Sequence, residues 1–448
     1  TGSLTQGLAL LGEAEASYRA TGNIPGLART LVRRTTAYQY SGNYTASLAD
    51  AEEAIILTSD LKAFSDINID AQRSKGLSLF HLGQGNQAVE WLEKSLEGYI
   101  ELGRTANIPV VLMELGMVYE QSLGNFQSAQ EAYKKAFDIG QTTGNSAWMA
   151  TLLNNMGVLY HLQAKYEEAI EAFEKGLSYA RESGHIRKEA LLLTSLGDLY
   201  VDIEEIKSAQ KSYDQALALI ASVDDFFLNH YLILAQAKIA RLQKKHEHAH
   251  KLLAQAQTQI KKSTSVYERG LFHLETGRLA VIEENIPQAL SNLQTAKRYF
   301  KQSGRHLERV WSQLWLSCAT YQHGDIDLTR AELDDVLTFS SQEHILPTIG
   351  PQVRQIQSRL VGIQDDPIIG VTFSAFMNEI NQNDAKLPAT RRGLRHLASV
   401  IPISKPQLTI LALGRAQVKI NNKTISPPDW KTQSVRELFF YFLATNNA

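Results

Sequence analysis

Cysteine is almost absent from this chain, which has the single residue Cys318 in 448 positions. One thiol excludes an internal disulfide framework and is typical of proteins that fold in a reducing compartment. Proline is scarce as well, with 11 residues, beside 28 glycines and 44% hydrophobic residues. This composition excludes both a disordered and a collagen-like chain.

No charge of one sign dominates, because 45 basic residues face 47 acidic ones and the formal net charge is −2. A global attraction to nucleic acid or to an anionic membrane is therefore excluded, and any such binding must be local. No apolar run approaches the roughly 18 residues that span a bilayer, and residues 1–11 lack a basic segment followed by an apolar core. We predict a cytoplasmic protein.

The sequence also lacks Gly-x-x-x-x-Gly-Lys-Ser/Thr and Gly-x-Gly-x-x-Gly, the loops that cradle phosphates at a helix N-terminus. No nucleotide or other cofactor is predicted for this chain by those routes.

A column of small residues recurs every 40 or 41 residues. Its members are Gly76, Gly116, Gly157, Gly197, Ala237, Gly277 and Ser317. A second column has the same spacing and contains Ala88, Ala129, Ala169, Ala209, Ala249, Ala289 and Thr329. Small residues at fixed spacing let a neighbouring helix or a bulky side chain approach closely. The period therefore predicts a chain of repeated, tightly packed helical units.

Bulky side chains keep the same period. Tyr119, Tyr160 and Tyr200 follow the first column by three residues, and Tyr133, Phe173 and Tyr213 follow the second by four. These offsets are one helical turn, so each unit should contain two amphipathic helices. Glycine-containing turns such as 124–126 within a unit and 183–185 between units support the division.

The segment 156–160, Met-Gly-Val-Leu-Tyr, followed by 166–170, Tyr-Glu-Glu-Ala-Ile, resembles the tetratricopeptide repeat. The resemblance covers about residues 1–340 and implies an all-α solenoid of about eight helix pairs, with residues 23–345 forming a superhelix. Ala240, Ala280 and Thr320 replace the tyrosines in the later repeats, so packing should differ there.

The register also makes predictions for the flanking segments. Residues 1–22 should hold the second helix of a repeat whose first helix is missing, so we expect a longer protein that continues on the N-terminal side. The period is lost after about residue 345, and residues 346–405 are predicted to form a helical cap or linker. Its basic stretch, 391–396, would either touch DNA phosphates in a larger protein or lie solvated.

From residue 406 the pattern changes to short strands, with Leu408 and Ile410 alternating before Val418 and Ile420. An amphipathic helix follows, with Val435, Leu438, Phe439, Phe442 and Leu443 on one face. About 40 residues of this kind cannot bury that face alone, so residues 406–448 are expected to be the beginning of a larger domain.

This end, with Trp430 leading into residues 436–443, resembles the opening of an OmpR-type winged-helix domain of the kind found in SARP-like activators. With the repeats, it resembles the MalT-like bacterial transcription activators, in which a sensor solenoid is joined to a DNA-binding domain. The resemblance implies that DNA is bound only through a complete C-terminal domain, and that a nucleotide-binding module precedes the repeats.

A ligand or partner should lie in the concave groove of the solenoid, which the first helix of each pair lines. Side chains one and four or five residues after the first small column, and two or three before it, face that groove. The candidate groove residues are Arg73, Asn154, Asn155, His161, Asp198, Lys238, Arg241, Arg278, Trp311 and Trp315.

These residues suggest three chemistries. Asn154 and Asn155 could clamp an extended peptide backbone through their amides. Lys238, Arg241 and Arg278 would form a positive strip suited to a carboxylate or phosphate.

Trp311 and Trp315 could stack on a sugar or hold an aromatic side chain. Each prediction has a structural alternative, because groove asparagines and basic residues are often merely solvated. Tryptophans four residues apart near a solenoid end often belong to the core.

Catalysis is not predicted. Residues 246–250, His-Glu-His-Ala-His, fit the zinc-protease pattern His-Glu-x-x-His, but Ala249 belongs to the small column and no third ligand is evident. No metal site is predicted beyond adventitious capture by His246 and His250. Cys318 follows the small column by one residue and is expected to be a packed side chain.

Two functions therefore compete. In the first, the chain is the sensor segment of a transcription regulator that binds a small effector, peptide or protein partner and couples it to a DNA-binding domain. In the second, it is a free-standing adaptor for peptides or partner helices. A sheet followed by a helix at residues 406–448 favours the first, and a solenoid cap there favours the second.

Overall fold

The computed structural model of the chain describes residues 4–142, 144–221, 223, 225–261, 265–342, 346–403, 408–411, 417–420, 423–430 and 432–445. Its internal contacts divide the chain into two compact units, residues 1–401 and 402–448. None of the helices in the described part is long and apolar enough to cross a membrane.

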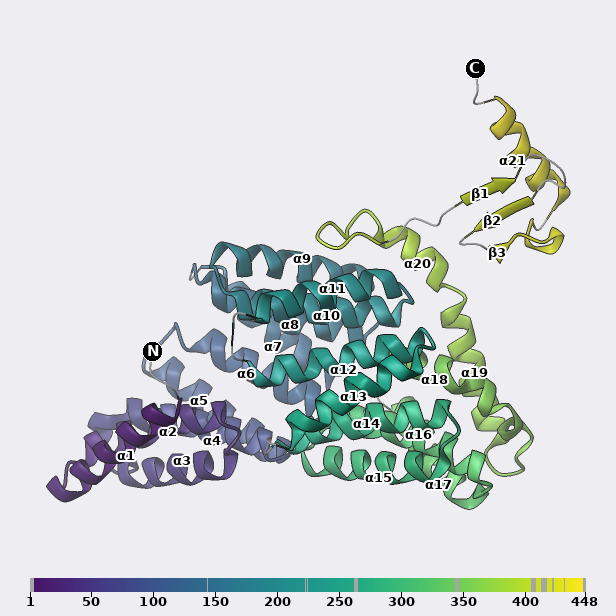
Figure 1. Cartoon of the computed structure of the whole chain (residues 1–448). Coiled ribbons are helices and arrows are strands. Elements are labelled where there is room, and N and C mark those ends of the chain that lie inside the picture. The colour runs from purple at the N-terminus through teal and green to yellow at the C-terminus, as the bar shows by residue number, and fades with distance from the viewer. Residues whose placement is uncertain are drawn as a thin grey trace. The chain divides into compact units, whose positions relative to one another are not determined.

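The first unit begins with a solenoid of antiparallel helices that stack in chain order (Figure 1). Helix α1 (Leu4–Thr21) precedes eight pairs within the described residues, with the short η1 (Lys62–Phe64) before the second pair. The pairs are α2 (Ile24–Tyr40) and α3 (Tyr44–Thr58), α4 (Ser65–His81) and α5 (Gly85–Glu101), α6 (Ile108–Gln121) and α7 (Phe126–Gly140), α8 (Ser146–Leu162) and α9 (Tyr166–Glu182), α10 (Ile186–Asp202) and α11 (Ile206–Ile220), α12 (Phe226–Leu242) and α13 (His246–Ile260), α14 (Val266–Ile282) and α15 (Ile286–Gln302), and α16 (His306–His323) and α17 (Ile326–Gln342). The predicted helix-pair solenoid is confirmed.

The small-residue column forms the seam within the pairs, and in three of them a glycine of this column faces an aromatic ring. A Cβ built on Gly157 would lie 2.5 Å from the ring of Phe173, and one built on Gly116 would lie 2.4 Å from the ring of Tyr133. Gly197 has the same relation to Tyr213, at 2.4 Å. These rings are almost wholly buried, so each glycine gives up its own side chain to admit the ring of the partner helix.

The turn inside each pair has one residue in the left-handed region, with φ between 53° and 87°. This position is Gly42, Gly83, Gly124, Ala164, Glu204, Lys244, Glu284 and Gly324 in successive pairs. Only glycine adopts this conformation without steric cost, and the left-handed helical region costs other residues roughly 1–2 kcal/mol. Four of these turns therefore carry backbone strain.

The solenoid curves far enough for late repeats to touch early ones. A Cβ built on Gly83 would lie 3.0 Å from the backbone nitrogen of Gly304. The guanidinium of Arg305 lies 5.4 Å from the ring centroid of Phe80 and donates to the side-chain oxygen of Gln121. The first helices of the intervening pairs therefore enclose an interior space.

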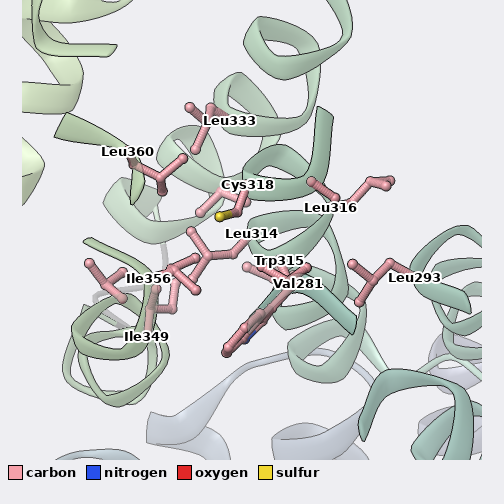
Figure 2. Close-up of a cluster of buried hydrophobic side chains, with 14 of the residues drawn as sticks. Val281, Leu293, Leu314, Trp315, Leu316, Cys318, Leu333, Ile349, Ile356 and Leu360 are labelled. Carbon is pink, nitrogen blue, oxygen red and sulfur yellow. The ribbon is translucent and has the colours of Figure 1, made fainter. Parts of the chain in front are cut away.

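After α17 the chain continues as α18 (Leu346–Ile356), η2 (Gln357–Arg359), η3 (Val361–Asp365), α19 (Gly370–Asp384) and α20 (Leu387–Leu394). Ile349, Val353 and Ile356 of α18 are fully buried in one cluster with Leu314 and Trp315 of α16 (Figure 2). The helical segment predicted after the repeats thus covers inward-facing side chains of the last repeats.

The second unit is an antiparallel sheet in the order β1 (Leu408–Leu411), β2 (Gln417–Ile420) and β3 (Lys423–Thr424), followed by η4 (Pro427–Trp430) and α21 (Gln433–Thr445) (Figure 1). Leu408 pairs with Ile420, and Lys419 pairs with Thr424. The ring of Trp430 lies 5.1 Å from that of Phe439.

Part of the predicted apolar face of α21 is open. Val435 and Leu438 are exposed, whereas the side chains of Phe442 and Leu443 lie outside the described residues. The sheet, η4 and α21 are the whole of the regular structure described in this unit.

We expect Gly157→Ala to lower stability by about 1–3 kcal/mol, because the new methyl must displace the fully buried ring of Phe173. The measurement is the urea midpoint, with helix content followed by circular dichroism. Gly12→Ala is the matched control, because nothing lies within 4 Å of its added Cβ and alanine favours the helix. Equal changes in the urea midpoint for the two variants would contradict the close packing of Gly157 against Phe173.

We expect Lys244→Gly to raise stability by about 0.5–1 kcal/mol, because glycine relieves the left-handed strain at φ 59° and loses part of that gain to its larger unfolded-state entropy. Lys251→Gly, at an exposed position inside α13, should instead lower stability by about 1 kcal/mol. Melting temperatures of both variants check the prediction. A loss of stability in Lys244→Gly would show that the turn carries no strain.

Candidate functional site: an internal cavity of the solenoid

The first helices of six successive pairs, from α6 to α16, surround a cavity of about 490 Å³. Phe339 of α17 and Pro347, Thr348 and Gln352 of α18 complete its wall. The cavity lies where the repeat register predicts the ligand groove. The predicted groove residues that line it are Asn154, His161, Asp198, Lys238, Arg278 and Trp311.

Asp198 is the centre of a polar network in the wall. It accepts hydrogen bonds from Tyr213 Oη and Tyr231 Oη, both at 2.7 Å, and from Lys238 Nζ at 2.9 Å. Burial would raise the pKa of Asp198, but the charge of Lys238 and the three hydrogen bonds outweigh it and lower the pKa. Asp198 is therefore a fixed negative charge whose lone pairs are largely occupied.

Two further polar pairs join α8 to α10. His161 Nε2 lies 2.9 Å from a carboxylate oxygen of Asp202, and Ser195 Oγ donates to Asn154 Oδ1 at 2.9 Å. Asn154 keeps its amide nitrogen for another acceptor. Asn155 does not line the cavity, and its buried Nδ2 has no partner among the described residues, so the predicted double amide clamp reduces to Asn154.

The sequence predicts that Lys238, Arg241 and Arg278 form a positive strip suited to a carboxylate or phosphate. The contacts of the two arginines contradict this prediction. Arg241 and Arg278 are 4% and 6% exposed and both pair with the buried Glu275, at 2.7 and 3.3 Å. Burial would raise the pKa of Glu275, but the two guanidiniums lower it. The repeat register places Glu275 in the groove, two residues before Gly277, but it does not show which inward-facing groups pair with one another.

Glutamines of α18 take the acceptor role that a ligand was predicted to fill. Gln352 Oε1 accepts from Arg278 Nη2 at 2.8 Å and from Trp315 Nε1 at 3.2 Å. Gln355 Oε1 accepts from Arg241 Nη1 at 2.7 Å. The inner face of the last repeats is therefore occupied by the chain itself.

The two tryptophans have separate places. Trp315 is fully buried in the core cluster of α14 to α19 and does not line the cavity (Figure 2). Trp311 is partly buried, lines the cavity, and has an indole nitrogen without a partner among the described residues. Arg73 lies outside the cavity and pairs with Glu114 on α6.

Glu120, Arg305 and Glu308 are among the cavity residues that sequence reasoning missed. Glu120 follows Gly116 by four residues, the same register as His161, so the signal was present. Burial raises the pKa of Glu120 to about 8, and its carboxylate accepts a hydrogen bond from Tyr133 Oη at 3.0 Å. Arg305 is the N-cap of α16 and Glu308 lies in its first turn, where no repeat column gives a signal.

The two sequence motifs with possible chemistry lie elsewhere. His246 and His250 pair with one carboxylate, Glu283, at 3.4 and 2.9 Å. Within the described residues, no group of three or more His, Cys, Asp or Glu side chains could hold a metal ion. Cys318 is buried in the core cluster, and this burial raises the pKa of its thiol to about 12.

Comparison with known proteins agrees with this architecture. The tetratricopeptide repeat model matches residues 69–142, 107–182 and 148–222, so the chain contains tetratricopeptide repeats. No curated protein sequence matches the chain significantly.

Two solved structures share the fold. A Rap protein in complex with the competence and sporulation factor is 11% identical, with a TM-score of 0.59 over 81% of this chain and 99% of its own. The Rap conjugation gene regulator of the plasmid pLS20, in complex with the Phr* peptide, is 13% identical, with a TM-score of 0.53 over 83% and 98%. At these identities the likeness establishes the fold alone.

The raised pKa of Glu120 predicts a pH-dependent stability. A carboxyl whose pKa rises from 4.5 to about 8 on folding contributes stability that is complete below pH 4.5 and is lost as the pH rises through 8. Glu120→Gln keeps an acceptor for Tyr133 and removes the titration. The variant should therefore gain stability over the natural protein between pH 5 and 8, measured by melting temperature. Exposed Glu131→Gln on α7 should not.

Proposed function

We propose that the solenoid is a recognition scaffold, not an enzyme, and that its cavity binds a short peptide. The observation that carries the proposal is a cavity of about 490 Å³ whose wall combines apolar surface with a few fixed polar groups. Sites of this size and composition hold drug-sized ligands. Two proteins of the same fold support the choice of a peptide as the ligand. One is in complex with the Phr* peptide, and the other is in complex with the competence and sporulation factor.

The charge of the wall favours a ligand that carries a positive group. Five carboxyl groups face the cavity against the three cations Lys238, Arg278 and Arg305, and four of the five remain negative when the buried Glu120 is protonated near neutral pH. The carboxyl groups are those of Glu120, Asp198, Asp202, Glu275 and Glu308. A peptide amino terminus or a basic side chain would balance this excess, and the amide nitrogen of Asn154 would bond a backbone carbonyl.

The apolar part of the wall accounts for the rest of such a peptide. Leu191, Leu234, Leu271 and Trp311 come from four successive first helices and face the same space. Apolar side chains of the ligand would be withdrawn from water there, which supplies the non-directional part of the affinity.

We further propose that the protein regulates transcription in the cytoplasm and couples its ligand to a DNA-binding domain at the C-terminal end. The order of a three-stranded antiparallel sheet and then α21 supports this, because it is the order implied by the winged-helix resemblance. The exposed face at Val435 and Leu438 also supports it, since the further helices of a winged-helix domain would cover such a face. A peptide adaptor without DNA binding is the alternative, and the two differ in whether the full-length protein binds DNA.

A pool of random pentapeptides tests the binding proposal. Immobilised protein should retain peptides enriched in lysine and arginine, as identified by mass spectrometry. Val158→Trp, which fills the cavity from α8, should abolish retention, while Val361→Trp at an exposed position on η3 should not. Equal melting temperatures of the two variants show that folding is intact. Retention that survives Val158→Trp, or no retention by the natural protein, would overturn the proposal.

A further inference from the structure

The C-terminal end of α10 faces two parts of the molecule at once. Asp198 and Asp202 line the cavity. Between them, Tyr200 is fully buried, and its hydroxyl donates to the backbone oxygen of Ile401 at 2.6 Å. In the turn that follows, the backbone oxygen of Ile203 accepts from Arg391 Nη1 at 2.9 Å. One helix end therefore contacts both the cavity and the segment that precedes the second unit.

That segment, residues 391–401, is held to the solenoid mainly by polar contacts and is called here the docked segment. The carboxylate of Glu174 on α9 accepts from the backbone nitrogens of Ser399 and Val400, both at 2.9 Å, and from Ser399 Oγ at 2.6 Å. Leu394 and Ile401 are its fully buried large side chains. Because so few of its side chains are buried, the segment can exchange between a docked and a released state. A bound ligand can shift that equilibrium.

The chain that leads to the docked segment builds part of the cavity wall. Pro347, Thr348 and Gln352 of α18 line the cavity, and Arg354 donates to the backbone oxygen of Asp202. Arg354 also pairs with Asp384 at the end of α19, at 2.5 Å. The chain from α18 to Ile401 is therefore fastened to α10 at Asp202, at Ile203 and at Tyr200.

We propose that a ligand in the cavity and the docking of residues 391–401 stabilise each other, with residues 198–204, the end of α10 and the turn that follows it, as the coupling element. The inference rests on the proposed function of the cavity. A ligand that contacts both α10 and α18 would bridge two elements that Arg354 and the docked segment also connect, so binding and docking would favour the same arrangement. By linkage, docking must raise ligand affinity by the factor by which the ligand favours docking.

Coupling of this kind would control the C-terminal unit. When the segment is docked, only residues 402–407 separate Ile401 from β1. When it is released, the connecting chain begins near the end of α20 and is several residues longer. Ligand binding would thus set the length of chain that joins the solenoid to the second unit.

The test uses variants outside the cavity, so that a loss of affinity cannot come from lost ligand contacts. Glu174→Ala removes the acceptor for three hydrogen bonds, and Tyr200→Phe removes only the hydroxyl that bonds Ile401. Both should speed hydrogen exchange at the amides of Ser399 and Val400. Both should also weaken binding of the pentapeptides retained by the natural protein by at least about fivefold, the lower end of usual coupling strengths. Glu171→Ala, at an exposed position on the same helix, should do neither.

The reverse measurement uses the natural protein. Saturating retained pentapeptides should slow exchange at Ser399 and Val400 by the same factor. If these peptides bind the natural protein but neither variant changes their affinity, the coupling is wrong and the cavity proposal stands. If no peptide binds, Val158→Trp serves as a built-in occupant. It should slow exchange at Ser399 and Val400 while Val361→Trp does not, and unchanged exchange would overturn the coupling without a ligand.

Discussion

The contact between a glycine on one helix and a ring on its partner sets the geometry of the solenoid. Where Gly116, Gly157 and Gly197 receive Tyr133, Phe173 and Tyr213, the helix axes can approach closely enough for successive pairs to stack. Because the seam repeats with a constant period, the first helix of every pair presents the same face inward. The cavity follows from this repetition, since six successive inward faces enclose it.

The cavity is small because α18 fills part of the interior of the solenoid. In an open solenoid the inward faces of the last repeats would be free to bind a partner. Here Gln352 and Gln355 satisfy Arg278 and Arg241, while Ile349 and Val353 bury their apolar surface against α16. Burying these guanidiniums is tolerable only because Glu275 and the glutamine oxygens pair with them. The space that remains open is the cavity lined by the first helices from α6 to α16.

The polar groups of the remaining wall are nearly all held in fixed positions. Asp198 has three donors, Asp202 pairs with the imidazole of His161, and Glu308 accepts a hydrogen bond from the hydroxyl of Tyr267. Such a wall is preorganised, so a ligand would meet dipoles that need little rearrangement. Glu120 differs, because its burial leaves it mostly protonated near neutral pH, and a cationic ligand would favour its ionisation.

The amino-acid sequence by itself determined the period, the helix pairs and the side chains that face inward. These follow from spacing, because small residues 40 or 41 apart must meet the same neighbour in every unit, and so Asn154, His161, Asp198 and Lys238 could be assigned to the cavity. Only the tertiary structure decided which of the inward-facing charged side chains are available to a ligand. Glu275 pairs with Arg241 of the preceding repeat and with Arg278 of its own helix, and α18 arrives from outside the repeats, where no period predicts its position. Trp311 and Trp315 lie one turn apart on α16, and the covering segment buries Trp315 while it leaves Trp311 beside the cavity.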